Sequence, residues 1–210
     1  VTPDTHLAKD VGLELGIRGS IAVNERMETS VPDIYAVGDA VEVTHFVTGQ
    51  KVLISLAGPA NKQGRIAADN ICGGNSHFTG SQGSSVLKLF GLTAASTGIN
   101  EKAAQATGIA YDKVVLFPAS HAAYYPGARS MAMKVLYEKE SLRLLGAQIV
   151  GGEGVDKRID VLATAIRAKM TALELTELDL SYAPPYSSAK DPVNMAGFMI
   201  EDLESGKVRQ

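Results

Sequence analysis

The stretch TSVPDIYAVGDA at residues 29–40 is the most informative part of the sequence for the fold of the first half of the chain. Pro32–Val37 forms an apolar run bounded by proline before it and Gly38 after it, which predicts a short buried strand. That strand delivers Asp39 at its carboxyl end, beside a glycine that lets a ligand approach the backbone closely. A carboxylate placed there can accept hydrogen bonds from a sugar or ribitol hydroxyl. An isolated Gly-Asp pair, however, is more often a turn in which the aspartate caps the next element.

A helix is expected soon afterwards, at residues 59–72, with proline in its first turn and Gly73-Gly74 as its stop signal. The small residues LAGPA at 56–60 open this helix. Free backbone N–H groups and the helix dipole favour an electron-rich acceptor at such a start. The alternative is an ordinary helix whose small residues only allow close packing.

The second half of the chain predicts an α+β domain. It follows a Gly- and Ser-containing connector at residues 75–81. Strands are expected at 85–98, 114–117, 131–137 and 142–150, with helices at 101–107 and 155–170. We therefore expect one domain at residues 1–78, a second at 79–200, and a tail or linker at 201–210.

Two loops carry most of the tyrosines: HAAYYPG at 121–127 and SYAPPYS at 181–187. A phenol has a reference pKa of about 10, so at neutral pH it can donate a hydrogen bond to a developing thiolate or peroxide oxygen. Loop tyrosines more generally stiffen loops and bury their rings. His121 suits a general acid, although a packed histidine bonded to its own loop is the better interpretation. GGEGVDKRID at 151–160 lacks the phosphate-loop patterns and indicates a strand-to-helix turn.

Composition narrows the class of protein. The chain has 210 residues, of which 45% are hydrophobic and 20% charged, with a net charge of -3. This balance argues against disorder and against nucleic-acid binding. The apolar runs are about strand length and too short for a membrane helix. Cys72 is the single cysteine, so we expect a structural thiol, no disulfide framework and a cytoplasmic protein.

Together these motifs resemble the pyridine nucleotide-disulfide oxidoreductases. Residues 29–40 are similar to the second flavin-binding motif of that family, and the LAGPA helix follows in the same order and spacing. The two tyrosine loops, followed by KDP at 190–192 and NMAG at 194–197, resemble the coenzyme A disulfide reductase branch. The resemblance extends from Pro3 to about Gly197. It implies the C-terminal part of an FAD-binding Rossmann-like domain, followed by a dimerisation domain with an antiparallel sheet and helices.

The resemblance also assigns roles to residues. Asp39, beside Gly38, would hold the ribityl chain of FAD, and the backbone of Ala57 would face the flavin ring. Tyr124 and Tyr182 would reach the partner subunit's active-site cysteine across a homodimer, with Tyr125 as the alternative to Tyr124. Asn61 and Lys190 match positions near a coenzyme A substrate.

Lys190 would offer a point charge to the phosphate or pantetheine groups of that substrate. The alternative interpretation, a solvated loop lysine with no binding role, is nearly as good.

The activity implied for the parent protein is an FAD-dependent NAD(P)H:disulfide oxidoreductase that reduces coenzyme A disulfide, or coenzyme A persulfide or polysulfide. The alternatives are an NADH oxidase on the same scaffold and a non-catalytic dimerisation module. The redox cysteine and the NAD(P)H-binding domain of the family would precede Val1. We therefore expect a C-terminal portion that is inactive alone and holds no flavin. Residues 198–207 continue as a linker would, which resembles forms fused to a rhodanese domain.

Overall fold

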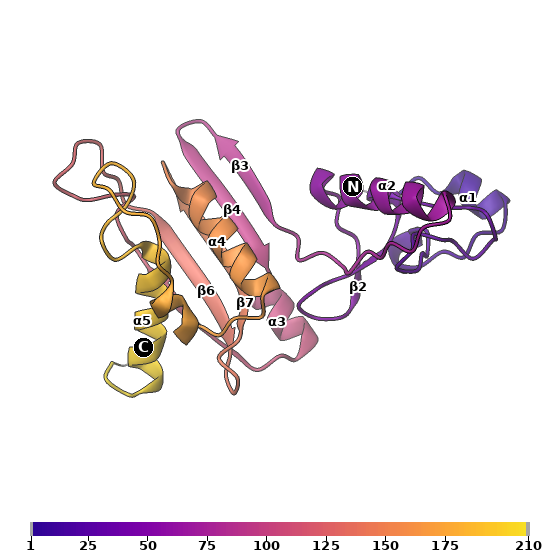
Figure 1. The fold of residues 1–210 in the computed structure, drawn as a ribbon. Helices are drawn as coiled ribbons and strands as arrows, with labels where there is room; N and C mark the ends of the chain where they lie inside the picture. The colour runs from indigo at the N-terminus through magenta and orange to yellow at the C-terminus, as the bar shows by residue number, and fades with distance from the viewer. Residues whose placement is uncertain (1, 209–210) are drawn as a thin grey trace. The chain divides into compact units, whose positions relative to one another are not determined.

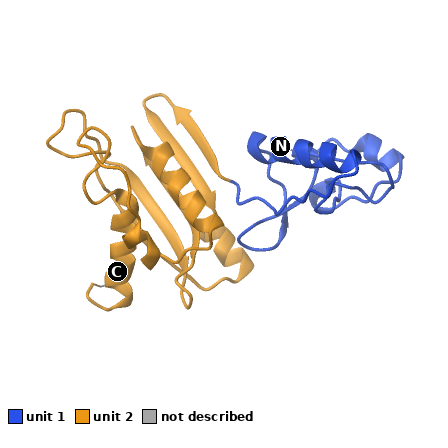
Figure 2. Ribbon diagram, in the orientation of Figure 1, with its two compact units in different colours: residues 1–83 blue, residues 84–210 orange. Residues whose placement is uncertain are grey.

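The structure, a computed structural model, describes residues 2–208 and divides into two compact units, 1–83 and 84–210 (Figure 2). The division falls at Gly83 rather than at the expected residue 78. The connector still belongs to unit 1 because the N–H of Ser81 donates to the carbonyl of Thr44 at 3.0 Å, and Ser81 forms a β-bridge with His45.

Unit 1 is built from short elements around one long helix. They are α1 (His6–Asp10), η1 (Ile17–Gly19), η2 (Gly38–Ala40), β1 (Val43–Thr44), β2 (Lys51–Val52) and α2 (Ala57–Ile71). Strands β1 and β2 pair antiparallel. The core of the unit is a cluster of six buried side chains: Val23, Met27, Val41, Val43, Ala67 and Phe78.

The strand predicted at residues 32–37 is not present. Asp33 adopts a left-handed backbone conformation with φ 64°, and Tyr35 forms only a single antiparallel bridge with Glu28. A strand needs neighbours that satisfy its backbone groups along its whole length, and one bridge does not supply them. The apolar run instead packs its half-buried side chains, Tyr35 among them, against the core cluster.

Helix α2 begins at Ala57, two residues before the predicted start, and Leu56 at its N-cap supplies no side-chain hydrogen bond. Its buried face includes Gln63, Ala67 and Asn70. The amide of Asn70 donates to the carbonyl of Arg26 at 3.0 Å and to that of Ser76 at 2.9 Å. These bonds fix the helix to the loops on either side of it.

Unit 2 contains one five-stranded antiparallel sheet in the order β3-β4-β7-β6-β5. The strands are β3 (Ser85–Leu89), β4 (Leu92–Gly98), β5 (Tyr111–Leu116), β6 (Ala132–Glu138) and β7 (Leu144–Gly151). The helices are α3 (Glu101–Thr107), α4 (Val155–Arg167), η3 (Leu173–Glu177) and α5 (Pro192–Glu204). The predicted α+β class with an antiparallel sheet is confirmed.

Helices α4 and α5 contact each other and cover one face of the sheet (Figure 1). Helix α4 lies across β4 and β7. Its side chains Ile159 and Leu162 are buried, as is Ile149 of β7. Packing beside β7 is also close at Gly146, where a Cβ would lie 1.8 Å from the carbonyl oxygen of Ile99. The sheet therefore tolerates only glycine at that position.

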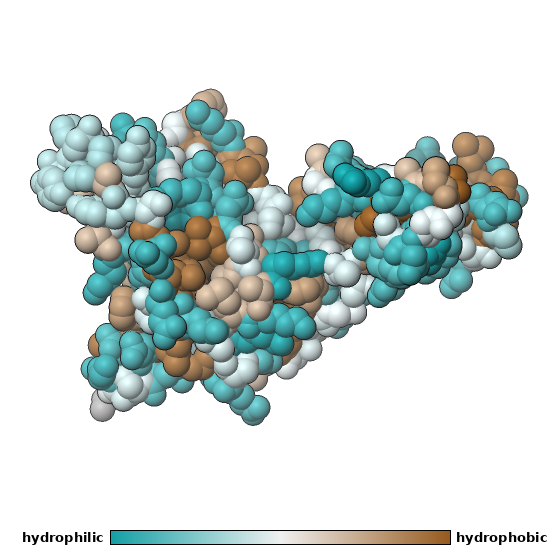
Figure 3. Space-filling model, viewed as in Figure 1, coloured by the Kyte–Doolittle hydropathy of each residue, from teal (hydrophilic) through white to brown (hydrophobic). Residues whose placement is uncertain are grey.

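Apolar side chains also remain exposed on unit 2. The strand register places Leu87, Ala94, Val150 and Ala132 directly beside one another across four strands, so they share one face. Leu87 is 60% exposed and Val150 44%. Figure 3 shows further apolar side chains along the β3 hairpin.

Helix α5 is not among the helices predicted from the sequence, and residues 201–204 belong to it instead of to the expected tail. Ile200 is buried, and the hydroxyl of Tyr137 donates to the Glu204 carboxylate at 2.7 Å. These contacts attach the last turn to the sheet. Among residues 2–208, no helix has the length and apolar character that crossing a membrane requires.

Candidate functional site

The two tyrosine loops lie side by side in unit 2. The backbone N–H of Ala122 donates to the carbonyls of Ser187 at 2.9 Å and Pro184 at 3.3 Å. Beyond this junction the hydroxyls of Tyr124 and Tyr182 lie 3.1 Å apart, within hydrogen-bonding distance. Tyr124 is 77% exposed and Tyr182 47%. The protein thus presents a bonded pair of phenols to solvent.

The hydrogen bond with Tyr124, followed by partial burial, raises the pKa of Tyr182 above its ordinary value. A hydrogen bond raises a phenol's pKa when that phenol is the donor, because ionisation would break the bond. Either hydroxyl of the pair can be the donor. The phenol that accepts this bond keeps its own O–H available to donate to a group outside the pair.

His121 and Tyr125 face their own loop. His121 is buried, with Nδ1 3.1 Å from the Ser120 hydroxyl and Nε2 3.2 Å from the carbonyl oxygen of Pro126. Its ring packs edge-on against Tyr125 at a centroid distance of 5.8 Å. Both imidazole nitrogens are therefore engaged within the loop. In the described residues, Tyr124 is the member of the adjacent pair that bonds to Tyr182.

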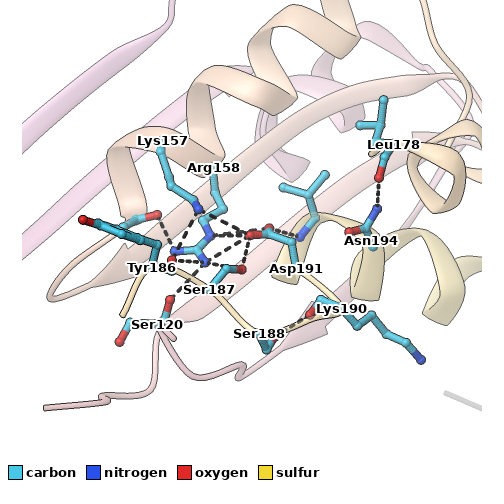
Figure 4. Close-up of polar contacts among 12 residues, drawn as sticks. Ser120, Lys157, Arg158, Leu178, Tyr186, Ser187, Ser188, Lys190, Asp191 and Asn194 are labelled. Atoms are coloured by element: carbon cyan, nitrogen blue, oxygen red, sulfur yellow. Dashed lines mark hydrogen bonds and ion pairs between the residues drawn. The ribbon is translucent and has the colours of Figure 1, made fainter. Parts of the chain in front are cut away.

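Beneath both loops lies Arg158 of α4, which is fully buried (Figure 4). Its guanidinium donates to the Asp191 carboxylate, with Nη2–Oδ2 at 3.1 Å and Nε–Oδ2 at 3.3 Å. It also donates to the carbonyls of Gly154 and Ser120, each at 3.0 Å, and to the Ser187 hydroxyl at 3.2 Å. The sequence did not single out this residue as a site residue. The available signal was its position three residues after Val155 and four before Leu162, within the apolar stripe of α4.

Asp191 completes this network. Burial disfavours its charged form, but hydrogen bonds from Ser187 at 2.6 Å and from the Val193 N–H at 3.0 Å, with the Arg158 charge, outweigh burial and lower the pKa of Asp191. The carboxylate therefore stays ionised and also serves as the N-cap of α5. One buried ion pair joins α4, α5 and both tyrosine loops.

Lys190 does not take part in this network. Its side chain is exposed and points away from the Arg158–Asp191 pair in Figure 4, with the ammonium 4.7 Å from the centre of the Phe198 ring. The ammonium is held by a cation–π contact and remains accessible from solvent.

The predicted flavin-binding residues lie in unit 1, where η2 packs against α2. Gly38 has φ 83° and an open space where a Cβ would stand, and its N–H donates to the buried Gln63 side chain at 2.7 Å. Asp39 is exposed, and its carboxylate accepts no hydrogen bond from any residue between 2 and 208. The side chain of Asp39 therefore does not cap the next element. Its carboxylate is free to accept hydrogen bonds from a ligand.

The start of α2, the helix against which η2 packs, offers free backbone donors. Ala57 and Gly58 are exposed in the first turn, and within the described chain their N–H groups have no partner. Asn61 is exposed one turn further along α2. A free carboxylate on η2 and an open, uncapped start of α2 together suit a ligand that carries both hydroxyl groups and an electron-rich ring. The residues therefore fit FAD.

Cys72 is an exposed free thiol at the C-cap of α2.

A five-stranded antiparallel sheet covered by helices thus follows, along the chain, a unit whose exposed Asp39 and open helix start fit a flavin. Residues 85–192 match the dimerisation domain of the pyridine nucleotide-disulphide oxidoreductases, and residues 1–64 match a second model of the same oxidoreductases. The chain belongs to the pyridine nucleotide-disulphide oxidoreductase family.

Three relatives illustrate the match. The chain is 38% identical over 202 residues to a coenzyme A disulfide reductase of Staphylococcus haemolyticus, covering 96% of this chain and 46% of that protein. The reduced CoADR-RHD structure of Bacillus anthracis is 51% identical with a TM-score of 0.96, covering 100% of this chain and 38% of that one. A NAD-dependent persulfide reductase of A. fulgidus is 45% identical with a TM-score of 0.95, covering 98% and 38%. The chain thus spans less than half the length of these relatives.

Proposed function

We propose that this chain serves an FAD-dependent NAD(P)H:disulfide oxidoreductase that reduces coenzyme A disulfide or coenzyme A persulfide. The observation that carries the proposal is the exposed, hydrogen-bonded pair of Tyr124 and Tyr182 on a dimerisation domain. Relatives named as coenzyme A disulfide reductase and persulfide reductase support the substrate class. In this assignment unit 1 is part of the flavin-binding domain and unit 2 the dimerisation domain.

The tyrosine pair would act on the sulfur that leaves during thiol–disulfide exchange. Exchange is faster when the leaving sulfur is a stabilised thiolate. One phenol of the pair donates to the other, and the accepting phenol donates its own O–H to the anionic sulfur, so the pair stabilises developing charge. Neither phenol needs to transfer its proton for this effect.

Unit 1 would hold FAD, which when bound supplies the electrons that come from NAD(P)H. Asp39 would accept hydrogen bonds from the ribityl hydroxyls, and Gly38 would allow the backbone to approach them. The free N–H of Ala57 at the start of α2 would face the ring carbonyl. Asn61 and Lys190 would contact coenzyme A, the lysine through a phosphate group.

A homodimer in the cytoplasm is part of the same proposal. The match of residues 85–192 to a dimerisation domain supports the dimer, and it would bring the tyrosine pair of one protomer to the redox centre of its partner. Light scattering of the full gene product should give twice the protomer mass. A monomer under assay conditions would contradict the cross-subunit role of the tyrosines.

Steady-state kinetics of the full gene product tests the substrate class. NADH- and NADPH-driven turnover should be measured with coenzyme A disulfide, coenzyme A persulfide and O2 as separate electron acceptors. We expect Tyr182→Phe to lower kcat with the sulfur acceptors by roughly 100-fold, the loss typical of one anion-stabilising donor. Tyr186→Phe is the matched control, because Tyr186 lies in the same loop and its exposed ring does not take part in the pair.

The outcomes separate the alternatives. Fast turnover with O2 and none with the sulfur acceptors would replace the proposal with an NADH oxidase. The absence of turnover with every acceptor, in a protein that dimerises, would replace it with a non-catalytic dimerisation module. Equal kcat values for the Tyr182 and Tyr186 variants would remove the tyrosine role.

A further inference from the structure

Arg158 combines complete burial with contacts to segments far apart in the sequence. Its donors reach Ser120, 38 residues before it, and Asp191, 33 residues after it. A buried charge is costly unless it is paired and fully hydrogen-bonded, and Arg158 meets both conditions. It is a built-in junction rather than a surface ion pair.

The junction sits at the base of the two loops that carry the phenols. On one side the guanidinium holds the carbonyl of Ser120, four residues before Tyr124. On the other it holds the hydroxyl of Ser187, five residues after Tyr182, and this hydroxyl is also tied to Asp191. The bond from the Ala122 N–H to the Ser187 carbonyl then closes the loops against each other. The contacts of Arg158 at the base of the two loops thereby fix the separation between the two phenols.

We propose that Arg158, through its pairing with Asp191, is the positioning residue that holds Tyr124 and Tyr182 in hydrogen-bonding register. The phenol geometry stands on the structure alone, whereas its consequence for turnover rests on the proposed function. Arg158 touches neither phenol and acts only through the two loops.

Lysine cannot replace this guanidinium. The contacts of Arg158 use three different nitrogens in a planar fork: Nε toward Asp191, Nη1 toward Gly154, and Nη2 toward Ser120, Ser187 and Asp191. An ammonium has three donors on one atom and cannot point them at acceptors spread along a fork. Arg158→Lys therefore keeps the charge and loses part of the connection between the loops.

The test follows the phenol pair itself. Protein labelled with 3-fluorotyrosine gives a 19F signal for Tyr182, assigned by its absence in Tyr182→Phe, and the pH dependence of this signal reports the pKa of that phenol. The Tyr124→Phe variant supplies the value without the hydrogen bond. In Arg158→Lys we expect the pKa of Tyr182 to fall to that value. The matched control is Arg129→Lys, since Arg129 is exposed and lies two residues after the Tyr124 loop, and this variant should keep the parent value.

Two results would overturn the proposal: a parent pKa of Tyr182 in folded Arg158→Lys, or an equal fall in Arg129→Lys. Circular dichroism establishes that the variants are folded. If Arg158→Lys does not fold, Asp191→Asn removes the partner charge while an amide oxygen can still cap α5, and the same shift is expected in it. An unchanged pKa in folded Asp191→Asn would overturn the proposal as well.

Kinetics of the full gene product separates the loss of phenol positioning from a general loss of structure in the protein. We expect Arg158→Lys to lower kcat with the sulfur acceptor by up to about 100-fold, as displacements of about 1 Å can do, with flavin reduction by NAD(P)H unchanged. A shifted Tyr182 pKa together with full turnover in Tyr182→Phe would support the positioning role while removing the proposed role of the tyrosines in turnover. A normal pKa in Arg158→Lys together with slow turnover in Tyr182→Phe would do the reverse.

Discussion

Replacing Asp191 by asparagine tests how much of the stability of unit 2 depends on the buried ion pair. Asp191→Asn keeps an oxygen that can accept from the Val193 N–H, so the cap of α5 is preserved. It removes the negative charge opposite Arg158, whose side chain is 1% exposed. The substitution leaves a buried guanidinium without its counter-charge.

The expected cost follows from that burial. Removing one partner of a buried ion pair costs about 3–5 kcal/mol, because the remaining charge stays desolvated. Unit 2 comprises residues 84–210. An unfolding entropy of roughly 2.1 cal/mol/K per residue gives about 0.27 kcal/mol/K for a unit of this size. The melting temperature of unit 2 should therefore fall by about 11–19 °C.

Differential scanning calorimetry at pH 7 measures this shift. Asp160→Asn is the matched control, since Asp160 is an exposed residue of α4, the helix that carries Arg158, and the free energy of unfolding of this variant should change by no more than about 0.5 kcal/mol. A fall of less than about 3 °C for Asp191→Asn would show that the pair contributes no more than an exposed one. The reasoning from burial would then be refuted.

Three further outcomes are expected. In urea unfolding, the difference in the free energy of unfolding between the parent and Asp191→Asn should narrow as the pH falls below 3.8. Because the pKa of Asp191 is lowered in the folded protein, the carboxylate contributes its full stabilisation above pH 3.8 and loses it on protonation. Gly146→Ala should cost about 3 kcal/mol in the same assay, because its Cβ would meet the Ile99 carbonyl. Tyr137→Phe should cost about 1 kcal/mol through the lost bond to Glu204.

Each of these has its own check. A gap that widens in acid would reverse the sign assigned to Asp191. Gly64→Ala is the control for Gly146, because Gly64 lies inside α2 with open space at its Cβ position, and alanine there should stabilise by about 1 kcal/mol. A loss for Tyr137→Phe that persists when Glu204→Gln is already present would show that the carboxylate is not the relevant partner.

Local signals in the sequence predicted helices α3 and α4 and the strand regions of unit 2, but not helix α5. Helix α3 has the predicted bounds because the Asn100 side chain caps its start at 2.9 Å, and Gly108 ends it with φ 71°. The β-rich runs around residues 131–150 became β6 and β7. In each case the deciding interactions lie within a few residues of the element, where pattern and capping can be read directly.

The errors arise where the outcome depends on distant contacts. Residues 32–37 have the composition of a strand, but only Glu28 bridges to the run, at Tyr35. Arg158 looks like a surface residue until Asp191, 33 residues later, is known to be its partner. The hydrogen bond between Tyr124 and Tyr182 also joins residues far apart in the sequence. Only the resemblance of the two loops to a known family predicted that these tyrosines act together.

The Arg158–Asp191 junction also constrains when the tyrosine loops can form during synthesis. Arg158 leaves the ribosome before its partner, and the 33 residues between them take roughly 2–7 seconds at 5–20 residues per second. During this interval the guanidinium lacks its counter-charge, and the loop around Tyr124 has nothing to close against. Unit 1 and the sheet can begin to form early, whereas the phenol pair waits for the start of α5. Slow codons between the two positions would lengthen the period in which the nascent chain is vulnerable to proteases and chaperones.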